Sequence, residues 1–415
     1  MKRLCLLVIL FSMVSLSASA QWYLFPGRKK NNNPPAQDTV RLTPRPDSAT
    51  FRLAQDSTAT ALADSLSARD SLDRSDLFVL DIPSVIRIAL ILPLQASAEN
   101  RASDNFLDLY SGALLALRDL GAAGLRAELE VFDSGDGKTP VPQSLLDGSD
   151  VIIGPVSLKD IQATLPRLGS GKVLISPLEP KVAELASTAP IVQNPSPWTA
   201  QIDELVRWVQ LDRLSGEDLY VIRDSTSTQA GTQAAYLIGA LHERGIPFRS
   251  VTTAGDIPFE KDRQVRVMIA SDIDNFITGA IRNLSIQGAR NNNVTLYGTT
   301  RVRTNGTSQT DLHNLNAHLT STYYIDYADP AVERFILAYR ALFQNEPGSF
   351  AFQGYDVMHY YVSICKLYGR QWYKKLQAFS ENGLQSDFRF TDENGRINQA
   401  VRRVIYKPDL TTSRQ

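Results

Sequence analysis

The sequence DVIIGPVSLKDIQATLPRLGSGKVLISP, residues 150–177, carries the pattern that decides the fold. It opens on a β-branched apolar run at residues 151–153, which is typical of a strand buried on both faces of a parallel sheet. Gly154 and Pro155 end that run, Ser157 is a good N-cap, and a helix with one apolar face follows. Two glycines close the helix before a second buried strand at residues 173–175. The pattern predicts a strand, a helix and a strand.

Similar units lie on both sides of this stretch. Further strands are predicted at residues 86–92, 125–132, 191–193, 219–222, 265–269, 294–297 and 320–325. Helices are predicted after Asp104 and Ser196, at residues 229–244, 273–284, 331–344 and 355–368, and near 371–380. A terminal hairpin is predicted from residues 387–391 and 401–406, with a turn at Asn394-Gly395. This alternation predicts an α/β protein built from doubly wound parallel sheets with helices on both faces.

Length and composition narrow the class of protein. A chain of 415 residues is too long for one ordinary domain and suits two after a non-globular start. The net charge is −1, with Lys and Arg scattered, so neither nucleic acid nor an anionic membrane surface is implied as a partner. Cys365 is the one cysteine outside the first 20 residues, and its apolar helical setting predicts a buried thiol.

The first 84 residues do not have the pattern of a folded domain. Residues 1–20 resemble a secretory signal peptide, with a charged start, an apolar run and the small residues Ala18-Ser19-Ala20. Residues 21–84 are predicted to be a disordered tether. Five Asp-Ser/Thr-X triplets in the tether, beginning at Asp38, Asp47, Asp56, Asp64 and Asp70, resemble the O-glycosylation pattern of exported Bacteroidetes proteins. The alternative is a solvated linker rich in Asp and Ser.

The rest of the chain has no apolar run of membrane-spanning length. We therefore expect no membrane span in the mature chain, and export to the periplasm or cell envelope.

Several short motifs follow one another in order across the predicted globular part. They are IALILPL, Phe106-x3-Tyr110-x-Gly112-Ala113, IIGPVS, ISPLEP, Gly354-Tyr355-Asp356 and FRFTDENGR. Together they resemble the type I periplasmic-binding fold, as in the branched-chain amino-acid receptors of ABC transporters, in a chain of Bacteroidetes type. The resemblance implies two lobes joined by three crossovers, with ligand bound in the cleft. The implied N-lobe is residues 85–193 plus 326–383, the C-lobe is residues 194–325 plus 384–409, and residues 410–415 form a tail.

In the N-lobe, the resemblance points to two loops that would hold a ligand. Ser157 occupies the loop in which receptors of this family bind a carboxylate, and it opens a helix whose N-terminus favours anions. The alternative role of Ser157 is that of a simple N-cap. The second loop continues from Ser176 to Leu178 and Glu179, and Pro180 stands where the family often has an amine-binding Thr. Proline offers neither a hydroxyl nor an N–H group there.

In the C-lobe, the resemblance is weaker at the ligand positions. Asp224 follows the first strand as in the family, but residues 225–231 (STSTQAG) lack the Tyr that closes over the ligand. The loop that usually supplies an acidic residue contains Thr299, Arg301 and Arg303, and is basic. Phe350 matches a family position that touches the ligand side chain, with core packing as its alternative role. A zwitterionic amino acid is thus disfavoured, and an anionic or sugar-like ligand, or none, fits better. Solvated loop charge is the alternative reading of the two arginines.

Signatures of catalysis are missing from the sequence. There is no Gly-x-Ser-x-Gly elbow, no His-Glu-x-x-His and no cysteine pair for a metal, so no enzyme, cofactor or metal site is predicted. The first functional hypothesis is an exported, non-catalytic solute-binding protein that captures a small polar molecule by hinge closure. The alternative is an envelope scaffold or regulator related to peptidoglycan synthesis, with a vestigial cleft and an envelope protein as its partner.

Overall fold

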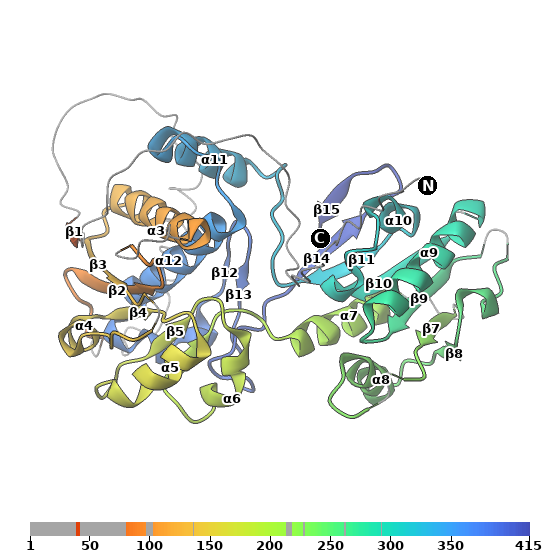
Figure 1. Cartoon of the computed structure of the whole chain (residues 1–415), viewed down its shortest axis with the longest axis horizontal. Coiled ribbons are helices and arrows are strands. Elements are labelled where there is room, and N and C mark those ends of the chain that lie inside the picture. Colours follow the sequence, from red (N-terminus) through yellow and green to blue (C-terminus); the bar gives the residue numbers. More distant parts are fainter. Residues whose placement is uncertain are drawn as a thin grey trace, which may run out of the picture. The chain divides into compact units, whose positions relative to one another are not determined.

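The computed structural model describes residues 39–41, 80–96, 103–135, 137–212, 218–226, 229–260, 263–291 and 293–415. The predicted signal peptide and nearly all of the acceptor triplets lie outside these residues. The strands form a six-stranded sheet, a seven-stranded sheet and a two-stranded ribbon, and helices cover both faces of each large sheet (Figure 1). The core is therefore α/β, as predicted.

The first sheet has the strand order β1-β3-β2-β4-β5-β6. Its strands are β1 (Thr39–Arg41), β2 (Ile86–Leu92), β3 (Ala127–Asp133), β4 (Val151–Ile153), β5 (Leu174–Ser176) and β6 (Ile191–Gln193). Its helices are α3 (Asp104–Ala122), α4 (Gln143–Gly148), α5 (Leu158–Thr164), α6 (Ala183–Ala186), α11 (Pro330–Phe343) and α12 (Ser349–Tyr368). All pairs from β3 to β6 are parallel.

Within the segment expected to be a tether, β1 pairs antiparallel with β3 and forms one edge of the first sheet, with Thr39 opposite Glu130.

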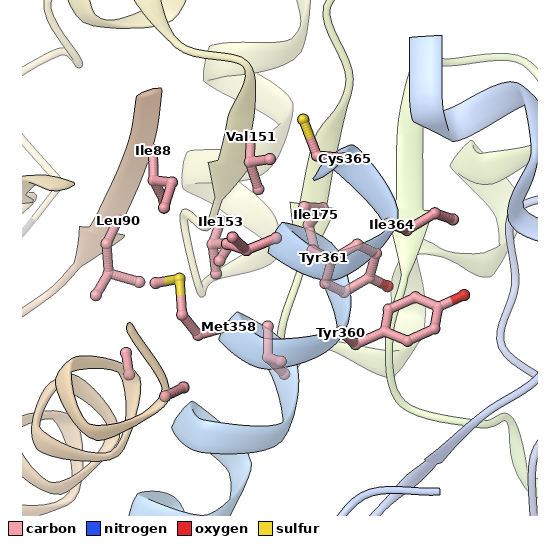
Figure 2. Packing of buried hydrophobic residues seen from close by; sticks show 14 of the residues in the cluster. Ile88, Leu90, Val151, Ile153, Ile175, Met358, Tyr360, Tyr361, Ile364 and Cys365 are labelled. Atoms are coloured by element: carbon pink, nitrogen blue, oxygen red, sulfur yellow. The ribbon is translucent and has the colours of Figure 1, made fainter. Parts of the chain in front are cut away.

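Strand β2 shows why this sheet is buried on both faces. Ile88 and Leu90 belong to the core that α3 and α12 cover, whereas Ala89 and Ile91 belong to the core on the opposite face. Side chains alternate between the faces of a strand, so an unbroken apolar run supplies both cores at once. Figure 2 shows α12 packed across β2, β4 and β5 through Met358 and its neighbours. Cys365 lies in this core and is fully buried.

Glycines set the close packing of helices α3 and α12. A Cβ atom on Gly112 would lie 1.8 Å from the carbonyl oxygen of Ala351, and one on Gly354 would lie 1.9 Å from the carbonyl oxygen of Leu109. Two backbones can approach this closely only where no side chain intervenes. The two glycines of the sequence motifs are thus explained by packing between these helices.

The second sheet has the order β15-β14-β11-β10-β9-β7-β8. Its strands are β7 (Leu219–Arg223), β8 (Arg249–Val251), β9 (Val265–Ala270), β10 (Val294–Thr299), β11 (His318–Ser321), β14 (Arg402–Tyr406) and β15 (Thr412–Arg414). Helices α7 (Trp198–Asp212) and α8 (Gln233–Glu243) pack on one face, and α9 (Asp274–Asn291) and α10 (Gln309–Asn314) on the other. The strands from β8 to β11 are parallel, and β14 and β15 add antiparallel edges.

Two elements differ from the sequence prediction in their position or type. The strand predicted at residues 320–325 is β11, which begins two residues earlier and ends at Ser321, because the backbone N–H of Tyr324 donates to Gln385 outside the sheet. The helix predicted near residues 371–380 is replaced by two 3₁₀ turns, Gly369–Lys374 and Leu376–Ala378. The indole of Trp372 donates to the carbonyl oxygen of Asp150, and this buried anchor holds the turns in place.

The predicted terminal hairpin is wrong. Residues 387–388 form β13, which pairs with β12 (Glu381–Asn382), whereas β14 joins β11. The side chain of Asn398 explains the difference. Its Oδ1 accepts from the N–H of Arg389 at 2.9 Å, and its Nδ2 donates to the carbonyl of Asp387 at 2.8 Å. One amide side chain thus satisfies groups that a second strand would have paired.

The predicted tail at residues 410–415 is also wrong, because β15 pairs with β14 there. Sequence reasoning missed β8, a short and largely exposed edge strand.

Candidate functional site

The loop after β4 uses Ser157 as a helix cap. Gly154 ends the strand with φ of 91°, and a Cβ atom there would lie 2.2 Å from the carbonyl oxygen of Ile91. The hydroxyl oxygen of Ser157 accepts from the N–H of Asp160 at 3.1 Å, and the hydroxyl donates to the Asp160 carboxylate at 2.7 Å. Ser157 is exposed, but its hydroxyl is already engaged within the first turn of α5. The geometry therefore favours the capping role that the sequence left open.

The loop after β5 is a closed turn. Ser176 is fully buried and donates to the carbonyl of Glu179 at 3.1 Å. The Glu179 carboxylate accepts from the N–H of Lys181 at 2.9 Å and caps a 3₁₀ turn. Leu178 is half-buried against the core of the first sheet. The structure thus brings these three predicted residues together, and the polar groups of Ser176 and Glu179 make hydrogen bonds within the turn.

Phe350 lies in the first turn of α12, half-buried against the same core. Its ring meets that of Phe106 edge-to-face, with 6.3 Å between the centroids. This arrangement supports core packing, the alternative role considered for Phe350.

The loops at the carboxyl edge of the second sheet are linked through Asp224 and Ser271. Asp224 is buried, and its carboxylate accepts from the N–H and hydroxyl of Thr226 at 2.9 and 2.7 Å. It also accepts from the hydroxyl of Ser271 at 3.0 Å. Ser271 in turn accepts from the N–H of Ile273 at 3.0 Å. Asp224 therefore ties the loop after β7 to the loop after β9.

Asp272 is a site residue that sequence reasoning missed. Its carboxylate accepts from the N–H groups of Gln233 and Ala234 at 3.2 and 3.1 Å, at the start of α8. The N-terminus of a helix attracts negative charge, and here a carboxylate of the protein itself occupies it. The Ser-Asp-Ile-Asp run that directly follows β9 was the available signal, because loops at this edge of a parallel sheet commonly carry functional side chains.

The basic loop after β10 contacts the loop after β9. Arg301 donates to the backbone oxygen of Asp272 and forms an ion pair with Asp274 at 3.0 Å. The hydroxyl oxygen of Thr299 accepts from the N–H of Arg301 at 3.2 Å and caps the following 3₁₀ turn. Arg301 therefore has an acidic partner within the protein.

The loops after β9 and β10 border a pocket at the carboxyl edge of the second sheet. The lining residues are Ile202, Leu205, Gln233, Ala234, Leu237, Ile269, Ser271, Ile277, Tyr297, Gly298, Thr299, Arg301 and Val302. The cavity among them has a volume of only about 30 Å³, which is room for about two water molecules, and it opens to solvent. The walls are apolar, and Gln233, Ser271, Thr299 and Arg301 supply polar groups. In this conformation the pocket is too small to enclose a solute, although apolar walls with a few polar groups are the usual lining of a small-molecule site.

Comparison with known proteins identifies the architecture. No family model and no curated protein matches the chain. A solved structure described as a putative branched-chain amino acid ABC transporter from Rhodospirillum rubrum is similar, with a TM-score of 0.54 and 15% identity over 80% of this chain and 100% of that one. The chain has the type I periplasmic-binding fold.

A substrate-binding protein from Desulfitobacterium hafniense in complex with Leu also matches, with a TM-score of 0.45 and 15% identity over the same shares of the two chains.

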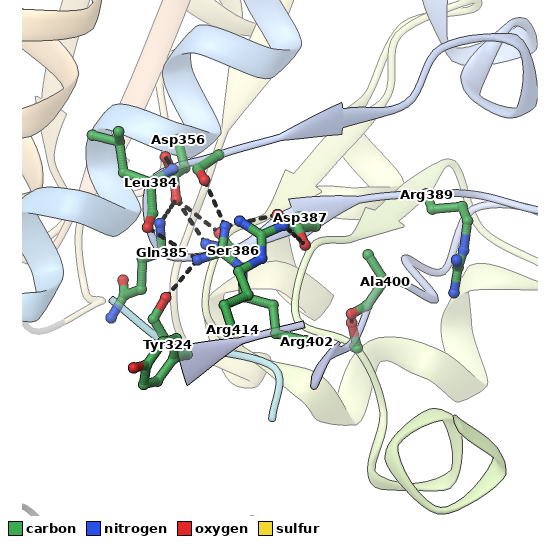
Figure 3. Close-up of polar contacts among 12 residues, drawn as sticks. Tyr324, Asp356, Leu384, Gln385, Ser386, Asp387, Arg389, Ala400, Arg402 and Arg414 are labelled. Atoms are coloured by element: carbon green, nitrogen blue, oxygen red, sulfur yellow. Dashed lines mark hydrogen bonds and ion pairs between the residues drawn. The ribbon is translucent and has the colours of Figure 1, made fainter. Parts of the chain in front are cut away.

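In this type I periplasmic-binding fold, the chain passes three times between the two large sheets. The passages are β6 to α7, β11 to α11, and β13 to β14. Asp356 of α12 holds the turn between β12 and β13, directly before the third passage, because its carboxylate accepts from the N–H groups of Leu384, Gln385 and Ser386 at 2.6, 2.8 and 2.9 Å (Figure 3). Burial raises the pKa of Asp356 to about 6, although these N–H donors act in the opposite direction.

Arg402 joins the third passage to the second. Its guanidinium donates to the carbonyl oxygens of Gly383 and Leu384, to the carbonyl of Tyr324, and to the carboxylate of Asp387 at 2.7 Å (Figure 3). The Arg402 side chain is 1% exposed. We call the contacts of Asp356 and Arg402 the clasp. The sequence did not predict these contacts, although it shows a charged residue in the apolar helix α12 and another in β14.

Among the described residues, no helix is long and apolar enough to cross a membrane. In the same part of the chain, no group of three or more His, Cys, Asp or Glu side chains is arranged to hold a metal ion.

Proposed function

We propose that this protein is an exported, non-catalytic solute-binding protein. The observation that carries the proposal is the pocket at the carboxyl edge of the second sheet, where apolar walls meet the polar groups of Ser271, Thr299 and Arg301. Loops at this edge line the ligand crevice in open α/β sheets. The similar structure from Rhodospirillum rubrum is described as a putative branched-chain amino acid ABC transporter, which supports a role of this kind.

The ligand is a small polar molecule bound between two lobes that close by a hinge motion. The lobes are residues 85–193 plus 326–383 and residues 194–325 plus 384–409. The clasp made by Asp356 and Arg402 supports a hinge of this kind, because it fixes two of the three passages to each other and concentrates any bending near them.

The class of ligand follows from the loops expected to meet it and from the acidic partners of Arg301 and α8. Pro180 has no hydroxyl oxygen to accept from an ammonium group, and residues 225–231 contain no Tyr, so a zwitterionic amino acid is disfavoured. An anion would have to compete with Asp274 for Arg301 and with Asp272 for the N-terminus of α8. A neutral, hydroxyl-rich molecule avoids both competitions and is the better candidate.

A second candidate function rests on the hydrogen bonds that the expected ligand-binding residues make within the protein. Ser157, Ser176 and Glu179 all make contacts within their own loops, and Arg301 is paired. This saturation favours a scaffold or regulator of the cell envelope, in which the fold is kept and the cleft is vestigial.

A thermal-shift screen of the full chain tests both proposals. Panels of amino acids, neutral saccharides and carboxylic acids are compared, since a ligand that binds the native state at 100 times its Kd stabilises it by about 2.7 kcal/mol. Arg301→Ala should abolish the response, whereas Arg303→Ala, an exposed residue of the same loop, should retain it. No response to any panel would contradict the solute-binding proposal and leave the scaffold as the candidate.

A further inference from the structure

Two aromatic side chains stand out on the surface of the second sheet's helices. Among the described residues, the exposed aromatic side chains are Trp198 at 37%, Tyr236 at 38% and Tyr327 at 68%. Trp198 begins α7 and Tyr236 lies in the first turn of α8. Their rings are 5.2 Å apart, nearly perpendicular. Trp198 and Tyr236 therefore form a contiguous aromatic patch, whereas Tyr327 is a single exposed ring.

Asp203 fixes the orientation of this aromatic patch. The hydroxyl of Tyr236 donates to both carboxylate oxygens of Asp203, at 3.1 and 3.2 Å. Tyrosine and tryptophan have only two side-chain torsions, so little conformational entropy remains to be lost when a ligand binds them. The patch is thus ordered before any ligand arrives.

The aromatic patch lies next to the pocket. Ile202 and Gln233 line the pocket, and they are one helical turn from Trp198 and Tyr236, respectively. Residues three or four apart in a helix share a face, so the patch continues the pocket wall outward along α7 and α8.

The charges around Asp203 select the class of ligand. Partial burial raises the pKa of Asp203, although the Tyr236 hydroxyl, Arg244 and Arg207 favour its ionised form and Glu243 opposes it. A cationic ligand would be repelled by the two arginines. An anionic ligand would be repelled by the carboxylates of Asp203 and Glu243. A neutral molecule meets neither obstacle, and its hydroxyl groups can donate to a carboxylate or accept from a guanidinium.

We propose that Trp198, Tyr236 and Asp203 form a subsite for a neutral pyranose ring of a saccharide. The aliphatic C–H groups on one face of a pyranose carry small positive charges and pack on the negative face of an aromatic ring. The hydroxyl groups at the ring edge bond to Asp203, whose carboxylate keeps acceptor capacity beyond the two contacts from Tyr236. This inference rests on the proposed solute-binding function and names the chemical class of the solute.

The test uses the full chain and a panel of glucose, galactose, N-acetylglucosamine, maltose, lactose and chitobiose. Binding is measured by saturation-transfer NMR and by the emission of tryptophan. Trp208 and Trp372 are buried at 0% and 1% exposure, so a ligand-dependent change that disappears in Trp198→Phe is assigned to Trp198. In the unmodified chain, a bound saccharide should also protect Trp198 from oxidation by N-bromosuccinimide, read as peptide mass.

At least one saccharide of the panel should bind, and Trp198→Ala should weaken its affinity at least tenfold. Asp203→Asn should weaken it less, because the amide keeps one acceptor oxygen. Tyr327→Ala, which removes an exposed tyrosine outside the aromatic patch, should leave the affinity unchanged.

Two results would overturn the inference. Absence of binding across the saccharide panel would overturn it while leaving solute binding open to the other ligand classes. Saccharide binding that Arg301→Ala abolishes and Trp198→Ala does not change would uphold the proposed function and reject this subsite.

Discussion

Replacing Gly354 with alanine tests the close approach of helices α3 and α12. The new Cβ would lie 1.9 Å from the carbonyl oxygen of Leu109 and 2.9 Å from its Cα. These are backbone atoms, so no side-chain rotation relieves the overlap. An ordinary contact of about 3.5 Å requires the helices to separate by about 1.6 Å locally.

The expected cost follows from two opposing effects. Overpacking of this kind costs about 3 kcal/mol, the upper end of the usual range, because both sides of the contact are backbone. Alanine gains about 1 kcal/mol over glycine in helix propensity. The net loss in the free energy of unfolding is about 2 kcal/mol, which lowers Tm by about 4–8 °C in a domain of this size.

The assay is thermal and urea unfolding followed by circular dichroism, with Gly121→Ala as the matched control. Gly121 also lies in α3, but nothing is within 4 Å of a Cβ placed there. This control should be as stable as the native protein or slightly more stable. If Gly354→Ala also unfolded at or above the native temperature, the close contact between the two helices would be wrong.

Three further predictions concern charged and titratable groups. Burial lowers the pKa of His318 to about 4. The His318 contribution to stability should therefore be full above pH 6.5 and fall by about 3 kcal/mol as the pH drops through 6.5 toward 4, because the unfolded chain takes up the proton first. Asp356, whose pKa is raised to about 6, contributes with the opposite sign over part of this range. Urea titrations of the native chain and of His318→Phe should therefore differ by the His318 contribution, and identical pH profiles would contradict it. Asp272→Ala should cost about 1 kcal/mol in chemical denaturation through loss of the α8 cap, and an unchanged midpoint would reject that cap. Arg402→Met should cost about 3–5 kcal/mol, because it leaves Asp387 and three carbonyl groups without this partner. A loss below that of Asp272→Ala would contradict the clasp.

The fold was predictable because the strands of both sheets are short apolar runs separated by helices with one apolar face. Residues 151–153 and 86–92 illustrate this, since short runs of β-branched and other apolar residues that end at Gly or Pro are typical of strands buried on both faces. The C-terminal hairpin was not predictable in the same way. Its turn forms, with the N–H of Gly395 donating to Thr391, but the side chain of Asn398 takes the place of a paired strand. A side chain that substitutes for backbone leaves no periodic pattern in the sequence.

The pocket contains two of the eight residues that the sequence suggested as ligand-binding. Thr299 and Arg301 were expected at the edge of the second sheet, and both line the pocket. Asp272 was missed, because an acidic residue in a loop does not reveal which helix it caps. Arg402 was missed because its partners are backbone carbonyls more than 15 residues away in sequence, and carbonyl groups have no sequence signature.

The position of α12 determines when the protein can fold. This helix completes the hydrophobic core of the first sheet, yet residues 349–368 follow the whole parallel part of the second sheet in the chain. As the polypeptide emerges during synthesis, β2 to β6 appear without the helix that covers one of their faces. That apolar surface needs protection until more than two thirds of the chain has been made. The order of the segments thus favours completion of the first sheet's core only near the end of synthesis.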